Sequence, residues 1–233
     1  MFTTDQYQLL DFGRGRKLER FGAYLLDRPA PAAELAERRD AAAWQQAAAR
    51  YERAGRGGQW NFHGKLAPTW IIRSSCSAFN LKFSRFGQVG LFPEQTASWS
   101  FIGQQVRAAG RPIKVLNLFA YTGGSTLVAA AMGALVTHVD AASSVVSWAR
   151  QNALASGLAN APIRWITDDV LKFARRELKR GEQYDAVVLD PPSYGHGPHG
   201  ERWKLEDQLG ELLDVCLKLM SRESQFLLLT CHS

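Results

Sequence analysis

Apolar and polar positions alternate regularly along the second half of the chain. From residue 112 onward, short apolar runs predict strands at 113–119, 135–140, 162–167, 184–190 and 224–230. Between them, apolar residues recur at helical spacing and predict helices at 125–133, 142–157, 169–181 and 204–220. Strands that alternate with helices in this way predict an α/β fold with a doubly wound, mostly parallel, Rossmann-like sheet.

The first half of the chain has a mixed pattern. Its aromatic and β-branched stretches favour strands at 7–12, 20–28, 59–64, 69–73 and 79–87. An Ala-rich segment, opened by proline and closed by glycine, predicts a helix at 31–55, and a second helix is predicted at 94–110. We therefore expect a small N-terminal α+β domain at 1–91, a connecting helix within 92–111 and a second domain at 112–233.

Composition narrows the class of protein. The apolar fraction of 46% is ordinary for a folded protein, and no apolar run approaches the roughly 20 residues that span a bilayer. The three cysteines form neither a CxxC motif nor an even-numbered framework, which disfavours a secreted, disulfide-linked protein. We expect a cytoplasmic protein without a membrane partner.

Charge is unevenly distributed along the sequence. Residues 1–114 hold 17 basic and 9 acidic side chains, whereas residues 115–233 hold 11 and 13. A basic half favours a polyanionic partner such as RNA, and the alternative is a basic surface that only solvent contacts. Aromatic residues suited to base stacking accompany these charges, namely Trp60, Phe62, Trp70, Phe79 and Phe83.

The segment "NLFAYTGGST" at 117–126 predicts a glycine turn between the first strand and its helix. Such a turn exposes backbone N–H groups to a ligand. The two adjacent glycines do not match the G-x-G-x-x-G pattern of dinucleotide sites, and Gly124 is followed by Ser125, where a P-loop requires lysine. S-adenosylmethionine (SAM) carries no phosphate, so it remains the best candidate.

Three further strands of this sheet end in carboxylates. Asp140 follows Gly123 by 17 residues, "TDD" ends in Asp168 and Asp169, and "DPPSYG" begins with Asp190. Because the carboxyl ends of parallel strands meet at one edge, we expect these groups near one ligand. Asp140 can accept both ribose hydroxyls, and Tyr194 can stack on a planar base. The alternative for "DPPSYG" is a rigid turn with an incidental tyrosine.

These motifs, together with "VTHVDAASSVVSWARQN", "DDVLKF" and "GLFPEQ", resemble class I SAM-dependent methyltransferases. Within that class they are similar to the bacterial ribosomal-RNA large-subunit methyltransferases, including the 5-methylcytosine type. The resemblance implies SAM as the cofactor, bound at Asp140 through the ribose, at Asp169 or Asp168 through the adenine, beside Asp190 at the methyl group, and also by Gln95, Phe119, Tyr121, Thr122 and Gly123. It implies RNA as the partner, held by the N-terminal domain. We expect no metal, because His196 and His199 lie in a glycine-rich loop without a nearby Cys or carboxylate cluster.

The sequence departs from that family in two places. Glu94 and Gln95 are followed by Thr96, where relatives often have arginine. The class has seven strands, whereas only five are predicted here, so the edge of the 224–230 strand lacks its usual cover. Either the chain is truncated, or a second copy or another protein covers that edge.

Cys231 follows the fifth strand in "TCHS". In 5-methylcytosine RNA methyltransferases, a cysteine at this place attacks the pyrimidine ring, and the alternative is a small apolar residue at a strand end. Asp190, Tyr194 and Cys231 are therefore the candidate catalytic residues. Cys216 is expected in the core, and the basic stretch 174–180 is expected to form a solvated helix face.

The sequence supports a SAM-dependent enzyme that methylates a base in RNA, at carbon if Cys231 is the nucleophile and at nitrogen otherwise. An alternative is a non-catalytic relative that binds RNA or SAM and lacks the last two strands. A nicotinamide-dependent oxidoreductase is a weaker third hypothesis because of the glycine pattern.

Overall fold

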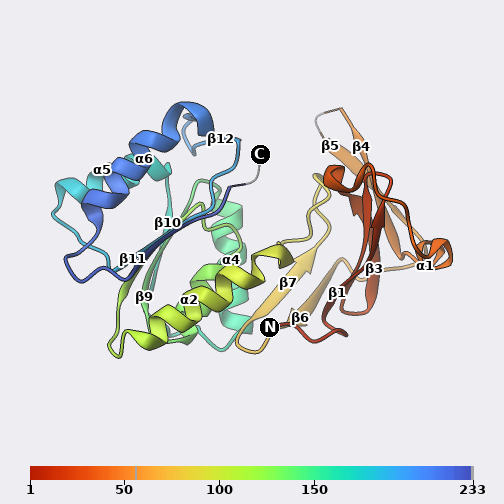
Figure 1. Cartoon of the computed structure of the whole chain (residues 1–233), viewed down its shortest axis with the longest axis horizontal. Coiled ribbons are helices and arrows are strands. Elements are labelled where there is room, and N and C mark those ends of the chain that lie inside the picture. Colours follow the sequence, from red (N-terminus) through yellow and green to blue (C-terminus); the bar gives the residue numbers. More distant parts are fainter. Residues whose placement is uncertain (56, 232–233) are drawn as a thin grey trace. The chain divides into compact units, whose positions relative to one another are not determined.

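The computed structural model describes residues 1–55 and 57–231, which divide into two compact units, Met1–Pro93 and Glu94–Ser233 (Figure 1). We refer to them as unit 1 and unit 2 and describe each by itself. Within the described residues, no helix has the length and apolar character needed to cross a membrane.

Unit 1 is built mainly from strands. Its larger sheet has the order β1-β2-β3-β4-β5, in which only the β3–β4 pair is parallel, and a separate hairpin joins β6 to β7. The strands are β1 (Tyr7–Gly13), β2 (Arg16–Phe21), β3 (Tyr24–Pro29), β4 (Ala49–Ala54), β5 (Gly57–Phe62), β6 (Thr69–Arg73) and β7 (Ala78–Lys82).

The interior of unit 1 combines aromatic residues with a buried ion pair. Phe21 and Phe79 are fully buried, and Tyr7 packs against Phe21 with ring centroids 5.2 Å apart. Beside them, the guanidinium of Arg28 donates to the fully buried carboxylate of Glu19 at 2.6 Å. Since a buried charge is costly without a partner, this pair holds β2 and β3 in register.

The single helix predicted at 31–55 is wrong. The segment contains a short 3-10 helix η1 (Pro31–Ala33), a five-residue helix α1 (Ala41–Gln45) and the strand β4. The side chain of Asp40 caps α1 by accepting hydrogen bonds from two backbone N–H groups, which fixes a helix start in the middle of the predicted helix. Because alanine favours helix on both sides of Asp40, the sequence pattern did not indicate a helix start at that residue.

The end of that segment alternates in burial, as a strand does. In β4, Ala49 and Tyr51 are buried whereas Arg50 and Glu52 are exposed, and β4 pairs with both β3 and β5. Burying the Tyr51 ring and completing two strand pairings outweigh the helix propensity of alanine, because propensity amounts to only a few tenths of a kcal/mol per residue.

Unit 2 is a doubly wound sheet, as predicted. Five parallel strands have the order β10-β9-β8-β11-β14, so the order reverses between β8 and β11. The strands are β8 (Lys114–Leu118), β9 (Leu135–Asp140), β10 (Ile163–Thr167), β11 (Ala186–Leu189) and β14 (Phe226–Leu229). The helices are α2 (Thr96–Ala108), α3 (Gly124–Ala131), α4 (Ser143–Ala155), α5 (Val170–Lys179) and α6 (Leu205–Leu219).

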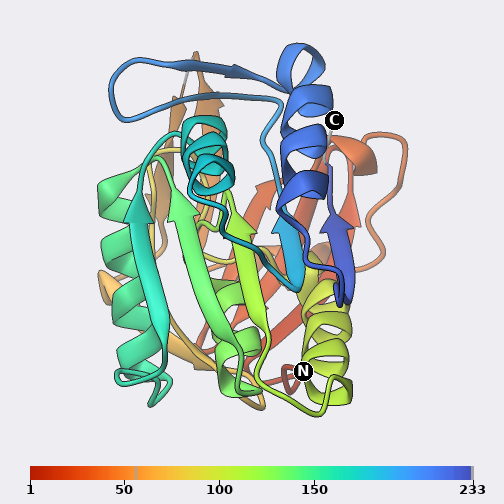
Figure 2. The same cartoon turned by 90° about the vertical axis from the view of Figure 1, so that its left-hand side faces the viewer.

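Helices cover both faces of this sheet (Figure 2). Leu116, Val187 and Leu189 pack with α5 and α6, whereas Val115, Ala186 and Val188 pack with α2 and α3. Side chains alternate between the faces of a strand, so each strand contributes to both cores. Because all five strands are parallel, their carboxyl ends lie at one edge of the sheet, where the loops converge.

A small hairpin that periodicity did not predict follows β11. Strands β12 (Tyr194–His196) and β13 (Arg202–Lys204) pair antiparallel and lie at the carboxyl-end edge of the sheet (Figure 2). Three-residue strands are too short for a period of two to be recognised. The hairpin places Tyr194 at this edge.

A buried polar chain connects the middle of the sheet to α3. The amide of Asn117 donates to the Thr126 hydroxyl at 2.8 Å, and that hydroxyl lies 2.9 Å from Nδ1 of His138. His138 is fully buried, and its Nε2 has no hydrogen-bond partner among the described residues. Burial, together with the charge of Arg150, lowers the pKa of His138 to about 3, so the imidazole is neutral.

We expect His138 to make the folded state acid-sensitive. Between its ordinary pKa of about 6.5 and its folded pKa of about 3, the unfolded chain binds a proton that the folded chain does not. The free energy of unfolding should therefore fall as pH drops below about 6.5, by at most about 1.4 kcal/mol per pH unit from this residue.

Urea unfolding followed by circular dichroism between pH 7.5 and 5 measures this slope. His138→Gln should flatten it, whereas the exposed control His63→Gln should keep the wild-type slope. An unchanged slope in His138→Gln would contradict the assignment.

Candidate functional site

The candidate site lies where the strand order reverses, at the carboxyl ends of β8 and β11. Ligands of open α/β sheets bind in this crevice, because the loops leaving the two central strands diverge to opposite faces. The turn 119–123 follows β8, and Asp190 follows β11. The carboxylates after β9 and β10 lie at the same edge.

The turn after β8 has an unusual backbone. Phe119, Tyr121 and Gly123 have φ angles of 54°, 49° and 94°. A left-handed conformation costs a non-glycine residue about 1–2 kcal/mol, so the surrounding structure must hold Phe119 and Tyr121 in place. Next along the chain, a Cβ on Gly124 would lie 2.3 Å from the Trp99 ring of α2, so only glycine lets α3 begin here.

Asp140 is one of the groups that hold this turn. Its carboxylate accepts from the backbone N–H of Tyr121 at 2.9 Å and from that of Ala142 at 3.0 Å. From α4, the Asn152 amide donates to the carbonyl of Thr122 at 2.9 Å. The side chains of β9 and α4 therefore fix the backbone that faces the site.

Burial raises the pKa of Asp140 above its ordinary value, although the backbone donors oppose that shift. A buried carboxylate of this kind binds strongly to further hydroxyl donors, because such bonds replace lost solvation. The two adjacent hydroxyls of a ribose are donors of this kind.

The two carboxylates after β10 have different local partners. Asp169 caps α5, and its Oδ1 accepts from the backbone N–H of Lys172 at 2.9 Å. Asp168 accepts from the N–H of Asp169 at 2.8 Å and forms an ion pair with Arg176. The sequence left both residues open as partners of an adenine.

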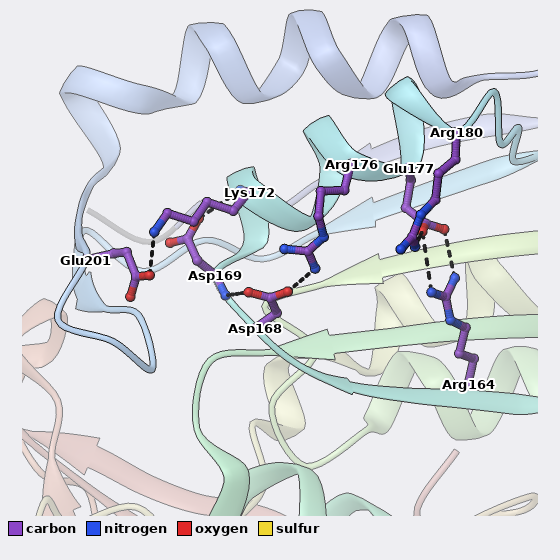
Figure 3. A network of polar contacts seen from close by, with 8 residues as sticks. All are labelled: Arg164, Asp168, Asp169, Lys172, Arg176, Glu177, Arg180 and Glu201. Atoms are coloured by element: carbon purple, nitrogen blue, oxygen red, sulfur yellow. Dashed lines mark hydrogen bonds and ion pairs between the residues drawn. The ribbon is translucent and has the colours of Figure 1, made fainter.

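Figure 3 shows that these carboxylates belong to a longer polar network along α5. Lys172 donates to Glu201 at 2.7 Å, which ties the loop between β12 and β13 to the first turn of α5. This hydrogen bond, with that from the His199 N–H, lowers the pKa of Glu201 to about 2. The hairpin that carries Tyr194 is therefore tethered at its tip.

The basic stretch 174–180 is more than a solvated helix face. Glu177 in its middle is fully buried and accepts from Arg164 at 2.8 Å and from Arg180 at 3.0 Å (Figure 3). It also accepts from the Tyr184 hydroxyl at 2.6 Å. Burial opposes ionisation of Glu177, but these donors together lower its pKa. The network anchors α5 to β10, which positions Asp168 and Asp169.

A second cluster surrounds Asp190. The Gln95 amide donates to Oδ2 of Asp190 and to the Thr230 hydroxyl, each at 3.2 Å. The Thr230 hydroxyl donates to Oδ1 of Asp190 at 2.6 Å. Residues from the start of α2 and the ends of β11 and β14 therefore orient one carboxylate beside the strand-order reversal.

Tyr194 stands on the hairpin and is half exposed. Its hydroxyl lies 3.1 Å from Nε2 of His196. On the paired strand β13, the buried Trp203 donates to the carbonyl of Pro192 at 2.7 Å and packs on Phe119, with ring centroids 4.8 Å apart. Trp203 thereby joins the two loops that flank the site.

The two cysteines of the C-terminal part have different environments. Cys216 is fully buried in α6, as predicted, and burial raises the pKa of its thiol to about 12. Cys231 is exposed and follows Thr230, a member of the Asp190 cluster. His232 lies outside the described residues.

The predicted residues thus converge on one edge of unit 2. Sequence reasoning missed the supporting residues Asn152, Thr230, Glu201 and Trp203. Thr230 could have been recognised, because it ends the fifth strand just as Asp190 ends the fourth. The others form contacts that depend on how distant elements pack, and no local pattern marks them.

The residues at this edge fit SAM. Asp140, Asp168 and Asp190 place carboxylate acceptors at the carboxyl ends of β9, β10 and β11, which suits a ligand with a ribose diol, an adenine amine and a sulfonium. The positive-φ turn supplies backbone close to the ligand.

A family model for S-adenosylmethionine-dependent methyltransferases matches residues 26–214. The chain belongs to this family. SAM is accordingly the cofactor of the family, and the nicotinamide hypothesis is set aside.

Solved structures agree with this methyltransferase fold. A SAM-dependent methyltransferase from Agrobacterium tumefaciens is 43% identical, with a TM-score of 0.94 over 98% of this chain and 73% of that one. SMU.776, a putative methyltransferase complexed with SAH (S-adenosylhomocysteine), is 18% identical, with a TM-score of 0.78 over 98% of this chain and 62% of that one. The second likeness shows the fold alone.

Curated relatives share a shorter region. Ribosomal RNA large subunit methyltransferase K/L from Shewanella frigidimarina is 28% identical over 64% of this chain and 20% of its own length. Ribosomal RNA large subunit methyltransferase K from Neisseria meningitidis is 27% identical over 71% of this chain and 46% of its own length. The chain thus spans between a fifth and a half of these relatives.

We expect Asp140→Ala to weaken binding of S-adenosylhomocysteine by one to two orders of magnitude. A hydrogen bond to a charged group contributes about 1.5–3 kcal/mol, and the variant also loses the support of the 119–123 turn. Isothermal titration calorimetry measures the affinity. Asp207→Ala on the exposed side of α6 is the matched control and should bind normally. Wild-type affinity in Asp140→Ala would refute the assignment.

Proposed function

We propose that the protein is an RNA methyltransferase that transfers the methyl group of SAM to a base, with ribosomal RNA as the first candidate substrate. The main support is the Gln95–Asp190–Thr230 cluster at the strand-order reversal, next to the positive-φ turn. The curated relatives are ribosomal RNA methyltransferases by name, which supports the substrate class.

In this proposal, the edge of unit 2 holds the cofactor from adenine to methionine. Asp168 or Asp169 accepts from the adenine amine, and Asp140 accepts from the ribose hydroxyls. Phe119, Tyr121, Thr122 and Gly123 line the methionine end, and Gln95 completes it. SAM supplies an electrophilic methyl group on a sulfonium.

Asp190 and Tyr194 position the target base beside that methyl group. The carboxylate of Asp190 is oriented on both oxygens by Gln95 and Thr230, so its direction is set before a base arrives. It accepts a hydrogen bond from the base, and the half-exposed Tyr194 ring stacks on the base plane. Pro191 and Pro192 keep the intervening loop stiff.

Two chemical routes are open at this site. In the first, a base nitrogen attacks the methyl directly and then releases its proton, either to Asp190 or to solvent. A cytosine C5 is too weakly nucleophilic, so Sγ of Cys231 first adds to C6, and the electron pair moves to C5. After C5 takes the methyl and S-adenosylhomocysteine leaves, Asp190 or solvent would accept the C5 proton, which expels Sγ as a thiolate and restores the ring.

Unit 1 is the proposed RNA-binding part, because the basic excess lies in the first half of the chain. Of the aromatics named for stacking, Phe79 is fully buried and unavailable, whereas Phe62 is half exposed. Strand β14 is the outer strand of its sheet among the described residues.

We expect Asp190→Asn to reduce methyl transfer to ribosomal RNA by roughly a hundredfold or more. The variant keeps the shape of the carboxylate but loses its charge. Transfer is measured with methyl-labelled SAM and ribosomal RNA from cells lacking the gene. Affinity for S-adenosylhomocysteine should change only a few-fold, and Asp214→Asn on α6 should be fully active. Normal transfer by Asp190→Asn would rule out its proposed role.

Cys231→Ser separates the two routes. If Sγ is the nucleophile, the variant should lose essentially all transfer while keeping cofactor affinity, because an alcohol is a far weaker nucleophile than a thiolate. In that case, mass spectrometry of the RNA methylated by the wild-type protein should identify 5-methylcytosine. Full activity in Cys231→Ser, verified as folded by circular dichroism, excludes the carbon route and leaves nitrogen as the target. Cys76→Ser in unit 1 is the matched control.

A further inference from the structure

One continuous part of unit 1 carries cations without any carboxylate. Residues 53–93 contain six Lys or Arg side chains and no Asp or Glu. The net charge of this stretch is therefore +6, the same as the net charge of the whole chain. It forms β5, the β6–β7 hairpin and the loop after β7. Such a stretch attracts polyanions at long range.

Aromatic rings in this region form a connected row from the interior to the surface. Tyr51 packs on Trp60 at 5.3 Å between centroids, Trp60 on Phe83 at 4.9 Å, and Phe83 on Phe62 at 5.0 Å. Tyr51 is 1% exposed, whereas Phe62 at the other end is 50% exposed. The buried end therefore fixes the position of the exposed ring.

The loop that carries Phe83 is held in one conformation. The Tyr51 hydroxyl donates to the carbonyl of Arg85 at 2.7 Å, and the Trp60 indole donates to that of Ser84 at 2.8 Å. Gly87 has a φ of 79° and packs so closely on the Tyr51 ring that a Cβ there would lie 2.5 Å away. The loop presents Phe86, which is 53% exposed, with the Arg85 guanidinium 4.6 Å from its ring centre.

Strand register adds a second arginine to this face. Tyr51 pairs with Trp60 and Arg53 with Gly58, so side chains alternating along β4 place Arg53 on the face that bears Tyr51. Glu52 points to the opposite face, where Arg50 pairs with it. Across the described ranges, no ion pair joins Arg53 or Arg85 to a carboxylate.

We propose that these residues, Arg53, Phe62, Phe83, Arg85 and Phe86, form a binding face for single-stranded RNA, here named the aromatic–arginine face. Unpaired bases stack on Phe62 and Phe86, and phosphates pair with Arg53 and Arg85. An acidic peptide would match the charge but has no planar bases to stack on the exposed rings. In a duplex the bases are already stacked on one another, so the rings favour unpaired strands.

This inference rests on the proposed RNA substrate and names where that RNA is held. The test measures fluorescence anisotropy of the full chain with a labelled 12-nucleotide oligouridine and with the corresponding adenosine–uridine RNA duplex. Phe62→Leu and Phe86→Leu keep apolar bulk but remove the ring. Each should weaken binding of the single strand about tenfold and leave duplex binding nearly unchanged.

The arginine variants report the phosphate contacts. Arg53→Ala and Arg85→Ala should weaken binding of both probes, and each should reduce the slope of log affinity against log salt by about one. Phe12→Leu, a 41% exposed ring on β1, and Arg14→Ala, an exposed arginine paired with Glu37, are matched controls and should behave as wild type.

The proposal is overturned if wild type does not bind the single strand, if it prefers the duplex, or if Phe62→Leu and Phe86→Leu bind as wild type. It is also overturned if Phe12→Leu weakens binding equally. Failure of the proposed function is distinguishable: in that case, these variants lose single-strand binding while wild type transfers no methyl group to ribosomal RNA. Normal methyl transfer with unaltered binding by the variants would instead reject only the face.

Discussion

The turn from Phe119 to Gly123 exists only because neighbouring groups hold it. Two non-glycine residues there adopt positive φ, which an isolated chain would avoid. Asp140 accepts a hydrogen bond from the Tyr121 N–H, and the Asn152 amide donates to the Thr122 carbonyl. The Ala120 N–H donates to the carbonyl of Val139. Every one of these partners comes from β9 or α4, so the cofactor turn depends on correct pairing of β8 with β9 and on the packing of α4.

Much of unit 2 could be predicted because its signals are local. Each strand of a parallel sheet is short and apolar, each crossover helix has its own periodicity, and the polar residue that ends a strand follows it directly in sequence. The partners of those polar residues are another matter. Gln95 meets Asp190 across 95 positions, and only the strand order and the direction of α2 bring them together.

Prediction failed where two local patterns competed. In the segment 31–55, alanine favours a helix, while the alternation of Ala49, Arg50 and Tyr51 favours a strand. Tyr51 decides the outcome, because its ring packs on Trp60 and its hydroxyl donates to the loop after β7. Likewise, Glu177 lies among four basic residues on α5, and its burial depends on Tyr184 and Arg164 from other elements.

The two sides of the site depend on strand pairings that differ in sequence separation. The central pair of the sheet, β8 with β11, joins Val115 to Ala186, which are 71 residues apart, whereas β8 and β9 pair across a much shorter loop. Closing the longer loop costs more chain entropy, and most of it must be synthesised first. Pairing of β8 with β9 brings Asp140 to the turn across the shorter loop, whereas Asp190 reaches the site through the β8–β11 pairing. The two sides of the site therefore differ in the length of chain that must be closed to form them.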